Sequence, residues 1–219
     1  MVLVTGVDDA GRGCVMGPLV IAGILIEEGD IPYLKSIGVK DSKLLTPKQR
    51  CTLAPKIEKI VLKCSYREIT PLEIDRVVFK AEKLRKLNYL EAVAMADVIN
   101  QLTPNVAYVD ASDVLADRYG RQIAQMLSIE AKVISEHKAD LNYPVVSAAS
   151  ILAKIRRDSI IENLKKIYGD FGTGYPHDPR LRHFLLKWFK EYGSFPEPVR
   201  KSWKTIRDII SNNSQGRLM

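Results

Sequence analysis

The chain has 219 residues, 46% of them hydrophobic, which is enough to bury the core of one sizeable domain. Lys and Arg outnumber Asp and Glu by 33 to 26, and the resulting net charge of +7 favours a polyanionic partner such as nucleic acid. No apolar run approaches the ~20 residues of a membrane span, and the N-terminus does not read as a signal peptide, so we expect a cytoplasmic protein that does not enter a membrane.

The N-terminal region predicts two strands with acids between them. Short β-branched runs at residues 2–7 and 19–26 are typical of buried strands. Asp8 and Asp9 follow the first run, where its strand is expected to end. Adjacent carboxylates repel each other unless a cation or proton compensates, and paired hard oxygen ligands suit Mg²⁺ or Mn²⁺. A surface turn with solvated acids is the alternative.

A glycine-rich loop follows these acids. Gly11 and Gly13 bracket Arg12, so the backbone can come close to a ligand while one guanidinium points at it. Further on, Asp41, Ser42 and Lys43 supply a hydroxyl and an ammonium on a constrained loop. This second loop is either a phosphate grip or a plain capping loop.

The remaining elements alternate between strand and helix patterns. Thr46 reads as an N-cap and Pro47 as the first residue of a helix towards Lys59. Later elements are a strand at 60–69, a helix at about 79–102, a strand at 106–110, a strand at 129–134, a helix from 145, and helices at 180–192 and 200–210. Residues 168–179 form a loop, Asp113 a turn or helix cap, and residues 211–219 are expected to be disordered. Trp188, Phe189 and Trp203 in the helical tail are expected to be core rather than stacking platforms.

The helix from residue 145 carries a polar stripe. At ~100° per residue, Ser147, Ser150, Lys154 and Arg157 share one side. Two hydroxyls and two cations in line could follow a phosphate backbone, and a solvated helix face is the alternative.

Two further acids stand in similar contexts to Asp8 and Asp9. Asp110 ends a strand pattern, and Asp140 precedes a helix. Ligands gather at the carboxyl ends of strands in an α/β sheet, so four converging carboxylates could hold two divalent ions for phosphodiester hydrolysis. His137 could steer a proton or a phosphate there, or lie on the surface. The three cysteines, Cys14, Cys51 and Cys64, show no metal-ligand pairing and are expected as free thiols, unless the source is a hyperthermophile that forms disulfides.

The motifs resemble those of type 2 ribonuclease H (ribonuclease HII), in an archaeal-like form. The resemblance starts at Gly6-Val-Asp-Asp-Ala-Gly-Arg-Gly and Met16-Gly-Pro, and departs from the family pattern at Asp9, usually Glu, and at Cys14, usually Pro. It continues through motifs that begin at Tyr108, Glu136, Val146, Gly172 and Arg200. His177 departs from the serine common in the Gly172 motif.

The resemblance implies roles for these residues. Asp8, Asp9, Asp110 and Asp140 match the family's metal ligands, and an Asp-Ser-Lys segment stands at the place of Asp41, Ser42 and Lys43. The Gly11–Gly13 loop and Tyr175 match the residues that read the ribose at an RNA–DNA junction, by detecting a 2′-hydroxyl that both donates and accepts a hydrogen bond.

We therefore expect an RNase H-like α/β fold with a mixed five-stranded sheet, flanking helices and a C-terminal helical cap. Residues 1–170 would be the catalytic domain, and residues 171–219 a substrate-recognition loop with the helical region. The expected function is an Mg²⁺- or Mn²⁺-dependent endonuclease that hydrolyses RNA in RNA–DNA hybrids and cuts 5′ of single ribonucleotides in duplex DNA. The alternatives are a two-metal DNA nuclease or strand-transfer enzyme of the same fold, and a non-catalytic binding module. We expect a monomer without a clamp-binding peptide at the C-terminus.

Overall fold

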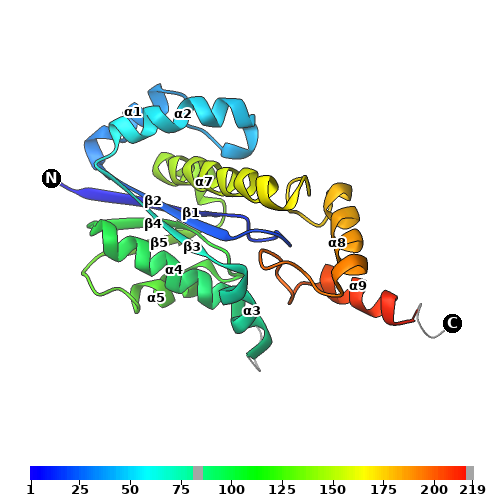
Figure 1. Cartoon of the computed structure of the whole chain (residues 1–219). Helices are drawn as coiled ribbons and strands as arrows, with labels where there is room; N and C mark the ends of the chain where they lie inside the picture. Colours follow the sequence, from blue (N-terminus) through cyan, green and yellow to red (C-terminus); the bar gives the residue numbers. More distant parts are fainter. Residues whose placement is uncertain (81–85, 216–219) are drawn as a thin grey trace. The chain divides into compact units, whose positions relative to one another are not determined.

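A mixed five-stranded sheet forms the centre of the N-terminal part of the chain (Figure 1). The computed structural model describes residues 1–80 and 86–215. The strand order is β3-β2-β1-β4-β5, with β1 antiparallel to β2 and parallel to β4, and β4 parallel to β5. The strands are β1 (Leu3–Ala10), β2 (Leu19–Glu27), β3 (Lys63–Ile69), β4 (Val106–Asp110) and β5 (Lys132–Glu136). The expected mixed five-stranded sheet is confirmed.

Helices connect and follow these strands in the described residues. They are α1 (Ile31–Ser36), α2 (Pro47–Ile60), α3 (Pro71–Lys80), α4 (Lys86–Leu102), α5 (Ala116–Ala124), α6 (Ala139–Asn142), α7 (Pro144–Tyr168), α8 (Pro179–Tyr192) and α9 (Lys204–Gln215), with 3₁₀ turns at Glu28–Asp30 and Ser42–Leu44. None of the helices in the described ranges is long and apolar enough to cross a membrane.

Two compact units can be distinguished in the chain. Unit 1 comprises Met1–Ala10, Val20–Glu68 and Asn88–Arg156, and unit 2 comprises Gly11–Leu19, Ile69–Leu87 and Arg157–Met219. Each unit is therefore discontinuous in sequence, and α7 contributes to both. The functional division expected at residue 170 stays a prediction, because this grouping assigns no function to either unit.

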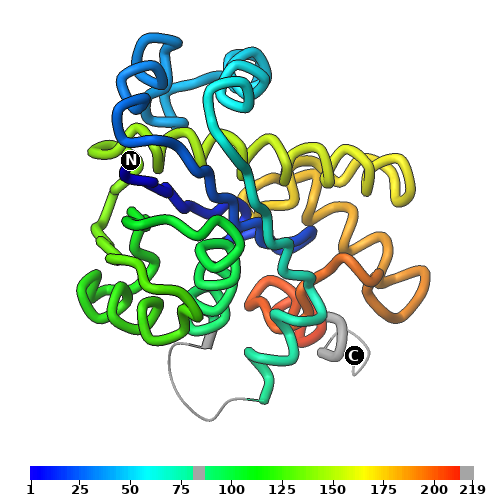
Figure 2. The backbone as a smooth tube through the Cα atoms, turned by 90° about the vertical axis from the view of Figure 1, so that its left-hand side faces the viewer, coloured from blue at the N-terminus to red at the C-terminus, as the bar shows by residue number. Residues whose placement is uncertain are grey.

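In unit 1, glycines let helices approach both faces of the sheet. A Cβ on Gly6 of β1 would lie 2.2 Å from the carbonyl carbon of Val145 in α7. On the opposite face, a Cβ on Gly23 of β2 would lie 2.5 Å from Val98 and 2.8 Å from Leu102 in α4. Figures 1 and 2 show the same layers, with α1, α2 and α7 over one face and α4 and α5 over the other.

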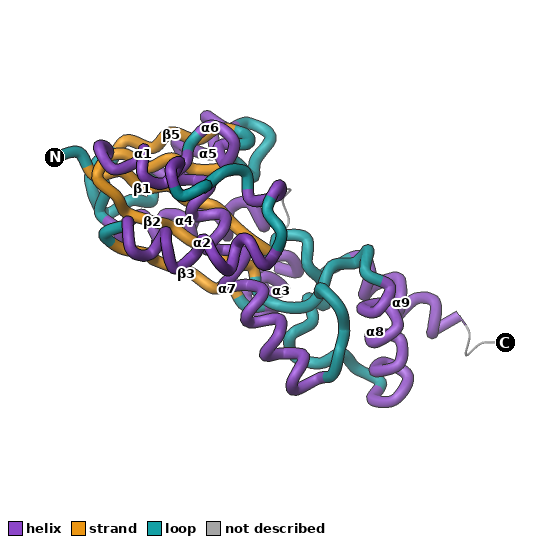
Figure 3. The backbone as a smooth tube through the Cα atoms, turned by 90° about the horizontal axis from the view of Figure 1, so that it is seen from above, coloured by secondary structure: helices purple, strands orange, loops and turns teal. Residues whose placement is uncertain are grey.

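Unit 2 has an apolar core of its own, to which α8, α9, the segment after β1 and the segment around Phe171 all contribute. Phe171 and Leu185 of this core are fully buried, as are Val15 and Met16 of the segment that follows β1. Phe189 and Trp203 pack against the cluster, which supports their assignment to the core. Figure 3 shows α8 and α9 as neighbouring helices, and residues from both line one cavity of about 260 Å³.

Several element boundaries differ from the sequence expectations. β1 does not end before the acids but runs through Asp8 and Asp9 to Ala10. β3 begins at Lys63 rather than residue 60, because α2 continues to Ile60. β5 covers Lys132–Glu136 rather than residues 129–134.

The helix expected at 79–102 is divided. Its first two residues end α3, which the sequence analysis missed, and α4 begins at Lys86; residues 81–85 lie outside the described residues. The expectation of disorder from residue 211 is wrong up to Gln215, since α9 continues that far, and residues 216–219 lie outside the described ranges. Asp113 does form a turn, where it accepts a bond from Leu115 N and pairs with Arg118, but Leu115 is the N-cap of α5.

Candidate active site

Two of the four predicted acids, Asp8 and Asp110, lie side by side on neighbouring parallel strands of unit 1. Val7 of β1 pairs with Val109 of β4, and the next residue on each strand is Asp8 or Asp110. Asp8 is buried, and burial, then the charges of Asp9 and Asp110, raise its pKa well above the ordinary value. Bonds from the Ser150 side chain and the Asp9 amide act in the opposite direction. The sheet therefore concentrates like charges at one point.

Asp140 joins this group through the turn that follows β5. The Ala139 amide donates to Asp110 Oδ1 at 2.8 Å, which fixes the start of α6 against the end of β4. Lys138, with a φ of 57°, turns the chain into α6. Burial, followed by the charge of Asp140, raises the pKa of Asp110, while the Ala139 amide opposes that rise. Asp110 is thus coupled electrostatically to both Asp8 and Asp140.

One lysine partly compensates these acids. The Lys43 ammonium donates to Asp140 Oδ2 at 3.0 Å, and its side chain remains 64% exposed. Burial lowers the Lys43 pKa, but the bond and charge of Asp140 outweigh it, so the net shift is upward. Asp41 accepts a bond from the Lys43 amide at 2.9 Å and so orders the loop that presents the ammonium.

Three residues of the polar stripe of α7 face this group rather than solvent. The Ser147 hydroxyl donates to the Asp140 carbonyl, and Ser150 lies 2.8 Å from Ser42, with both of these oxygens buried. Lys154 donates to Ser42 and Ser150, and burial lowers its pKa. The alternative of a solvated helix face is therefore wrong for Ser147, Ser150 and Lys154.

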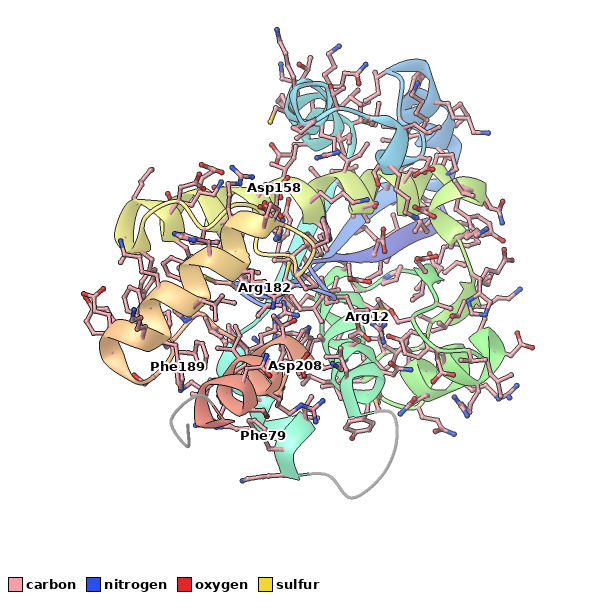
Figure 4. All side chains as sticks on the ribbon, turned by 90° about the vertical axis from the view of Figure 1, so that its right-hand side faces the viewer. Arg12, Phe79, Asp158, Arg182, Phe189 and Asp208 are labelled. Atoms are coloured by element: carbon pink, nitrogen blue, oxygen red, sulfur yellow. The ribbon has the colours of Figure 1, made fainter. Side chains whose placement is uncertain are left out.

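In unit 2, the glycine loop forms a closed turn. The Cys14 amide donates to the Gly11 carbonyl at 3.1 Å, with Arg12 and Gly13 between them. Gly11 has a φ of 91°, and a Cβ there would lie 2.8 Å from the Pro18 carbonyl oxygen, so this position requires glycine. Figure 4 labels the Arg12 side chain of this turn.

Tyr175 lies against this turn. A Cβ on the exposed Gly13 would be 3.9 Å from the Tyr175 ring, and the Arg157 guanidinium stands 4.7 Å from the ring centroid. The His177 ring stacks at 5.6 Å. The structure therefore brings Gly13 and Tyr175 together, as the predicted ribose-reading site requires.

Two arginines of this region have contacts that the sequence did not predict: Arg157 was expected only on the phosphate-binding stripe, and Arg200 was not expected as a site residue. Arg200 is fully buried and donates to the carbonyls of Gly11, Arg12 and Gly17 at 2.8, 2.8 and 3.1 Å. Arg157 donates to the Cys14 sulfur at 2.8 Å and to the Thr173 carbonyl. The position of Arg157 on the predicted stripe was the available signal for it. For Arg200, the sequence offered no signal, because an arginine is ordinarily expected to be exposed.

The acids of unit 1 fit a divalent cation in their chemistry. Oδ1 of the buried Asp140 has no hydrogen-bond partner, and Asp8 carries like-charge repulsion that a cation would relieve. In the part of the chain that the structure describes, however, no three Asp, Glu, His or Cys side chains stand as a ready-made ligand set. His137 is bonded to the Val114 carbonyl at 3.2 Å. Its charge is a minor influence that opposes the rise of the Asp110 pKa.

The sheet order and acid positions define an RNase H-like α/β protein, and solved structures agree. The ribonuclease H2 of Pyrococcus horikoshii superposes with a TM-score of 0.89 at 46% identity, over 97% of this chain and 99% of that one. The ribonuclease HII in a PCNA complex from Archaeoglobus fulgidus has a TM-score of 0.83 at 39% identity, over 94% and 96%.

Sequence comparison agrees with the fold. The ribonuclease HII of Methanosarcina acetivorans is 47% identical over 216 residues, 94% of this chain and 95% of its own. The family model for ribonuclease HII matches residues 5–206. The chain therefore belongs to the ribonuclease HII family, and it is a ribonuclease H, a hydrolase of RNA–DNA hybrids; metal binding is characteristic of the family.

Proposed function

We propose that this ribonuclease cuts on the 5′ side of single ribonucleotides embedded in duplex DNA, as well as within the RNA strand of continuous hybrids. The products would carry 3′-hydroxyl and 5′-phosphate ends. The observation that carries this proposal is the close approach of the Tyr175 ring to the exposed Gly13, where a Cβ would lie 3.9 Å from the ring. A sugar can pack on such a ring while its 2′-hydroxyl reaches backbone groups.

Asp8, Asp9, Asp110 and Asp140 would hold two Mg²⁺ or Mn²⁺ ions. When bound, these ions would offset the charge of the acids and stabilise the attacking and leaving oxygens of the phosphodiester. The support for this assignment is the unpartnered Asp140 Oδ1 together with the raised pKa values of Asp8 and Asp110. Since no three acids are preassembled among the described residues, ligation requires side-chain adjustment.

The basic residues around the acids would bind the phosphate backbone. Lys43 is the best placed, because its ammonium is largely exposed and already contacts Asp140. Lys154 is more buried and would add positive potential behind Ser42 and Ser150. Contacts of Asp41, Ser42, Ser147 and Ser150 with substrate stay predictions; their bonds within the protein support a role in orienting Lys43, Asp8 and Asp140.

In unit 2, Gly11, Arg12, Gly13 and Tyr175 would recognise the ribose. Arg200 holds the carbonyls of Gly11 and Arg12, which fixes the path of the turn. No base edge is needed for this recognition, so we expect little dependence on base sequence. On this assignment residues 1–170 carry the hydrolytic acids, and residues 171–219 contribute Tyr175 and the helical region.

Two rival functions remain distinguishable by one experiment. A labelled duplex with a single ribonucleotide is incubated with the protein with and without Mg²⁺, beside an all-DNA duplex and a continuous hybrid. We expect Mg²⁺-dependent cutting 5′ of the ribonucleotide and none in the all-DNA duplex. Cutting of both duplexes would indicate a DNA nuclease, and binding without cutting a non-catalytic module.

The partner of the solved Archaeoglobus relative suggests a further test. Its structure is a complex with PCNA, and this chain is 39% identical to it. We propose that this chain acts as a monomer and that its last residues, 211–219, make no contact with a sliding clamp, because they lack paired aromatic side chains. A clamp pull-down abolished by deletion of these residues would prove the second point wrong, and light scattering tests the first.

A further inference from the structure

Cys14 connects the glycine turn to Tyr175 in unit 2. Its side chain is fully buried, its amide closes the turn onto the Gly11 carbonyl, and its sulfur accepts a bond from Arg157 Nη2 at 2.8 Å. A hydrogen bond from the Tyr175 side chain lowers the pKa of this thiol, and the Arg157 guanidinium that bonds the sulfur also stands 4.7 Å from the Tyr175 ring centroid. The glycine turn, Arg157 and Tyr175, which shape the predicted ribose-reading site, therefore all interact with Cys14.

The thiol remains neutral in this position. Burial raises the pKa of Cys14 more than the charges of Arg157 and Arg200 and the Tyr175 bond lower it. A neutral sulfur can accept hydrogen bonds weakly, so it accepts the protons of both Arg157 and Tyr175. Cys14 is thus an acceptor in a cluster that is otherwise rich in donors.

We propose that Cys14 is a positioning residue for Tyr175, because it holds the tyrosine hydroxyl and thereby fixes how the ring meets a ribose. This inference rests on the proposed function, in which Tyr175 reads that ribose. When the Tyr175 O–H donates to sulfur, the lone pairs of its oxygen remain to accept a hydrogen bond from the 2′-hydroxyl. Arg157 supports the arrangement, since it bonds the sulfur and also stands over the ring.

The residue type at this position matters for the same reason. Proline at position 14 would have neither an amide proton for the Gly11 carbonyl nor a polar side-chain atom for Tyr175. In this chain the turn and the tyrosine are therefore coupled by contacts that proline cannot make. Serine would keep both kinds of contact, whereas alanine would keep only the amide.

The test is a double-mutant cycle read out as substrate preference. kcat/KM is measured for Cys14→Ala, Cys14→Ser, Tyr175→Phe and the Cys14→Ala/Tyr175→Phe pair, on a single-ribonucleotide duplex and on a continuous hybrid. Removal of one hydrogen bond predicts that Cys14→Ala lowers the ratio of the two efficiencies by about 2- to 10-fold. Cys14→Ser should restore most of it, and Cys51→Ala, at an exposed cysteine of α2, should leave it unchanged.

The cycle separates the possible failures. In the Tyr175→Phe background, Cys14→Ala should change the ratio by less than about 2-fold, because the hydroxyl through which it acts is gone. An equal effect in both backgrounds, or no effect in either, overturns the role of Cys14. If Tyr175→Phe itself leaves the ratio unchanged, the ribose-reading function of Tyr175 fails instead. Thermal melting identifies variants that fold poorly, and Cys14→Val, similar in volume but apolar, then replaces Cys14→Ala.

Discussion

Lys43 Nζ lies 3.0 Å from Oδ2 of Asp140, while Oδ1 of the same buried carboxylate has no partner. The Lys43 ammonium thus bonds one of the two carboxylate oxygens of Asp140. The charge of this carboxylate acts on Asp110, and that of Asp110 acts on Asp8. The pKa values of Asp110 and Asp8 are raised by burial and by their acidic neighbours. These three carboxylates have less positive charge around them than their own negative charge, and a divalent cation would compensate the difference.

Replacement of one acid should therefore abolish most turnover without unfolding the protein. Asp8→Asn or Asp110→Asn removes a charged ligand at nearly constant volume, and we expect kcat in Mg²⁺ to fall by about 100-fold or more. A second readout is thermal: Mg²⁺ should raise the melting temperature of the wild type more than that of either variant. Cleavage by both variants at the wild-type rate would remove the metal-site assignment.

Lys43 should act on binding more than on chemistry. In Lys43→Ala, the log–log slope of hybrid affinity against salt should decrease by about 0.7–0.9, because the variant neutralises one phosphate fewer than the wild type. Lys35→Ala, at an exposed lysine of α1, is the matched control and should keep the slope. An unchanged slope in Lys43→Ala, combined with a loss of turnover, would instead indicate a role of this lysine in catalysis.

The fold depends on the close approach of α7 to β1 at Gly6. A methyl group there would lie 2.2 Å from the Val145 backbone, which cannot move without displacing the start of α7. Gly6→Ala should destabilise the protein by about 1–3 kcal/mol, or about 2–12 °C in melting temperature. Gly29→Ala, where nothing lies within 4 Å of the new methyl group, should melt like the wild type. Equal melting of the two variants would contradict this packing.

Asp178 should give unit 2 a pH-dependent stability. Its carboxylate caps α8, and bonds from Arg180 and then from the Thr173 amide hold its pKa well below the usual range. A folded-state pKa below the unfolded value of about 3.9 stabilises the native state above that pH, and this stabilisation is lost as pH falls. Asp178→Asn should therefore melt lower than the wild type at pH 7, with a difference that shrinks below about pH 4. A constant difference across this range would show that charge is not the cause.

Local sequence signals predicted much of the fold. Thr46 and Gln49 form the capping box that starts α2, with Pro47 in its first turn, where the N-cap was expected. β4 also has its expected limits. The same type of signal at Thr70 and Glu73, which exchange hydrogen bonds around Pro71, marks the start of α3 and was overlooked. The miss was one of interpretation, because the motif was present.

The contacts of the site were harder to predict than its residues. The helical spacing of α7 placed Ser147, Ser150 and Lys154 on one side, but spacing alone cannot show that this side faces the acids. Arg200 is the clearest limit: its partners are carbonyls more than 180 residues away in sequence, and carbonyl partners leave no residue-type signature.

The most direct measurement of ribose recognition compares Tyr175→Phe with Tyr175→Ala on the two substrates. The Phe variant keeps the ring and loses one hydrogen bond, so kcat/KM on the single-ribonucleotide duplex should fall about 2- to 10-fold. The Ala variant also loses the packed ring and should fall about 5- to 150-fold further. Both losses should be smaller on a continuous hybrid, where many 2′-hydroxyls are available. Equal losses on the two substrates, accompanied by a lower melting temperature, would mean that Tyr175 only packs its loop.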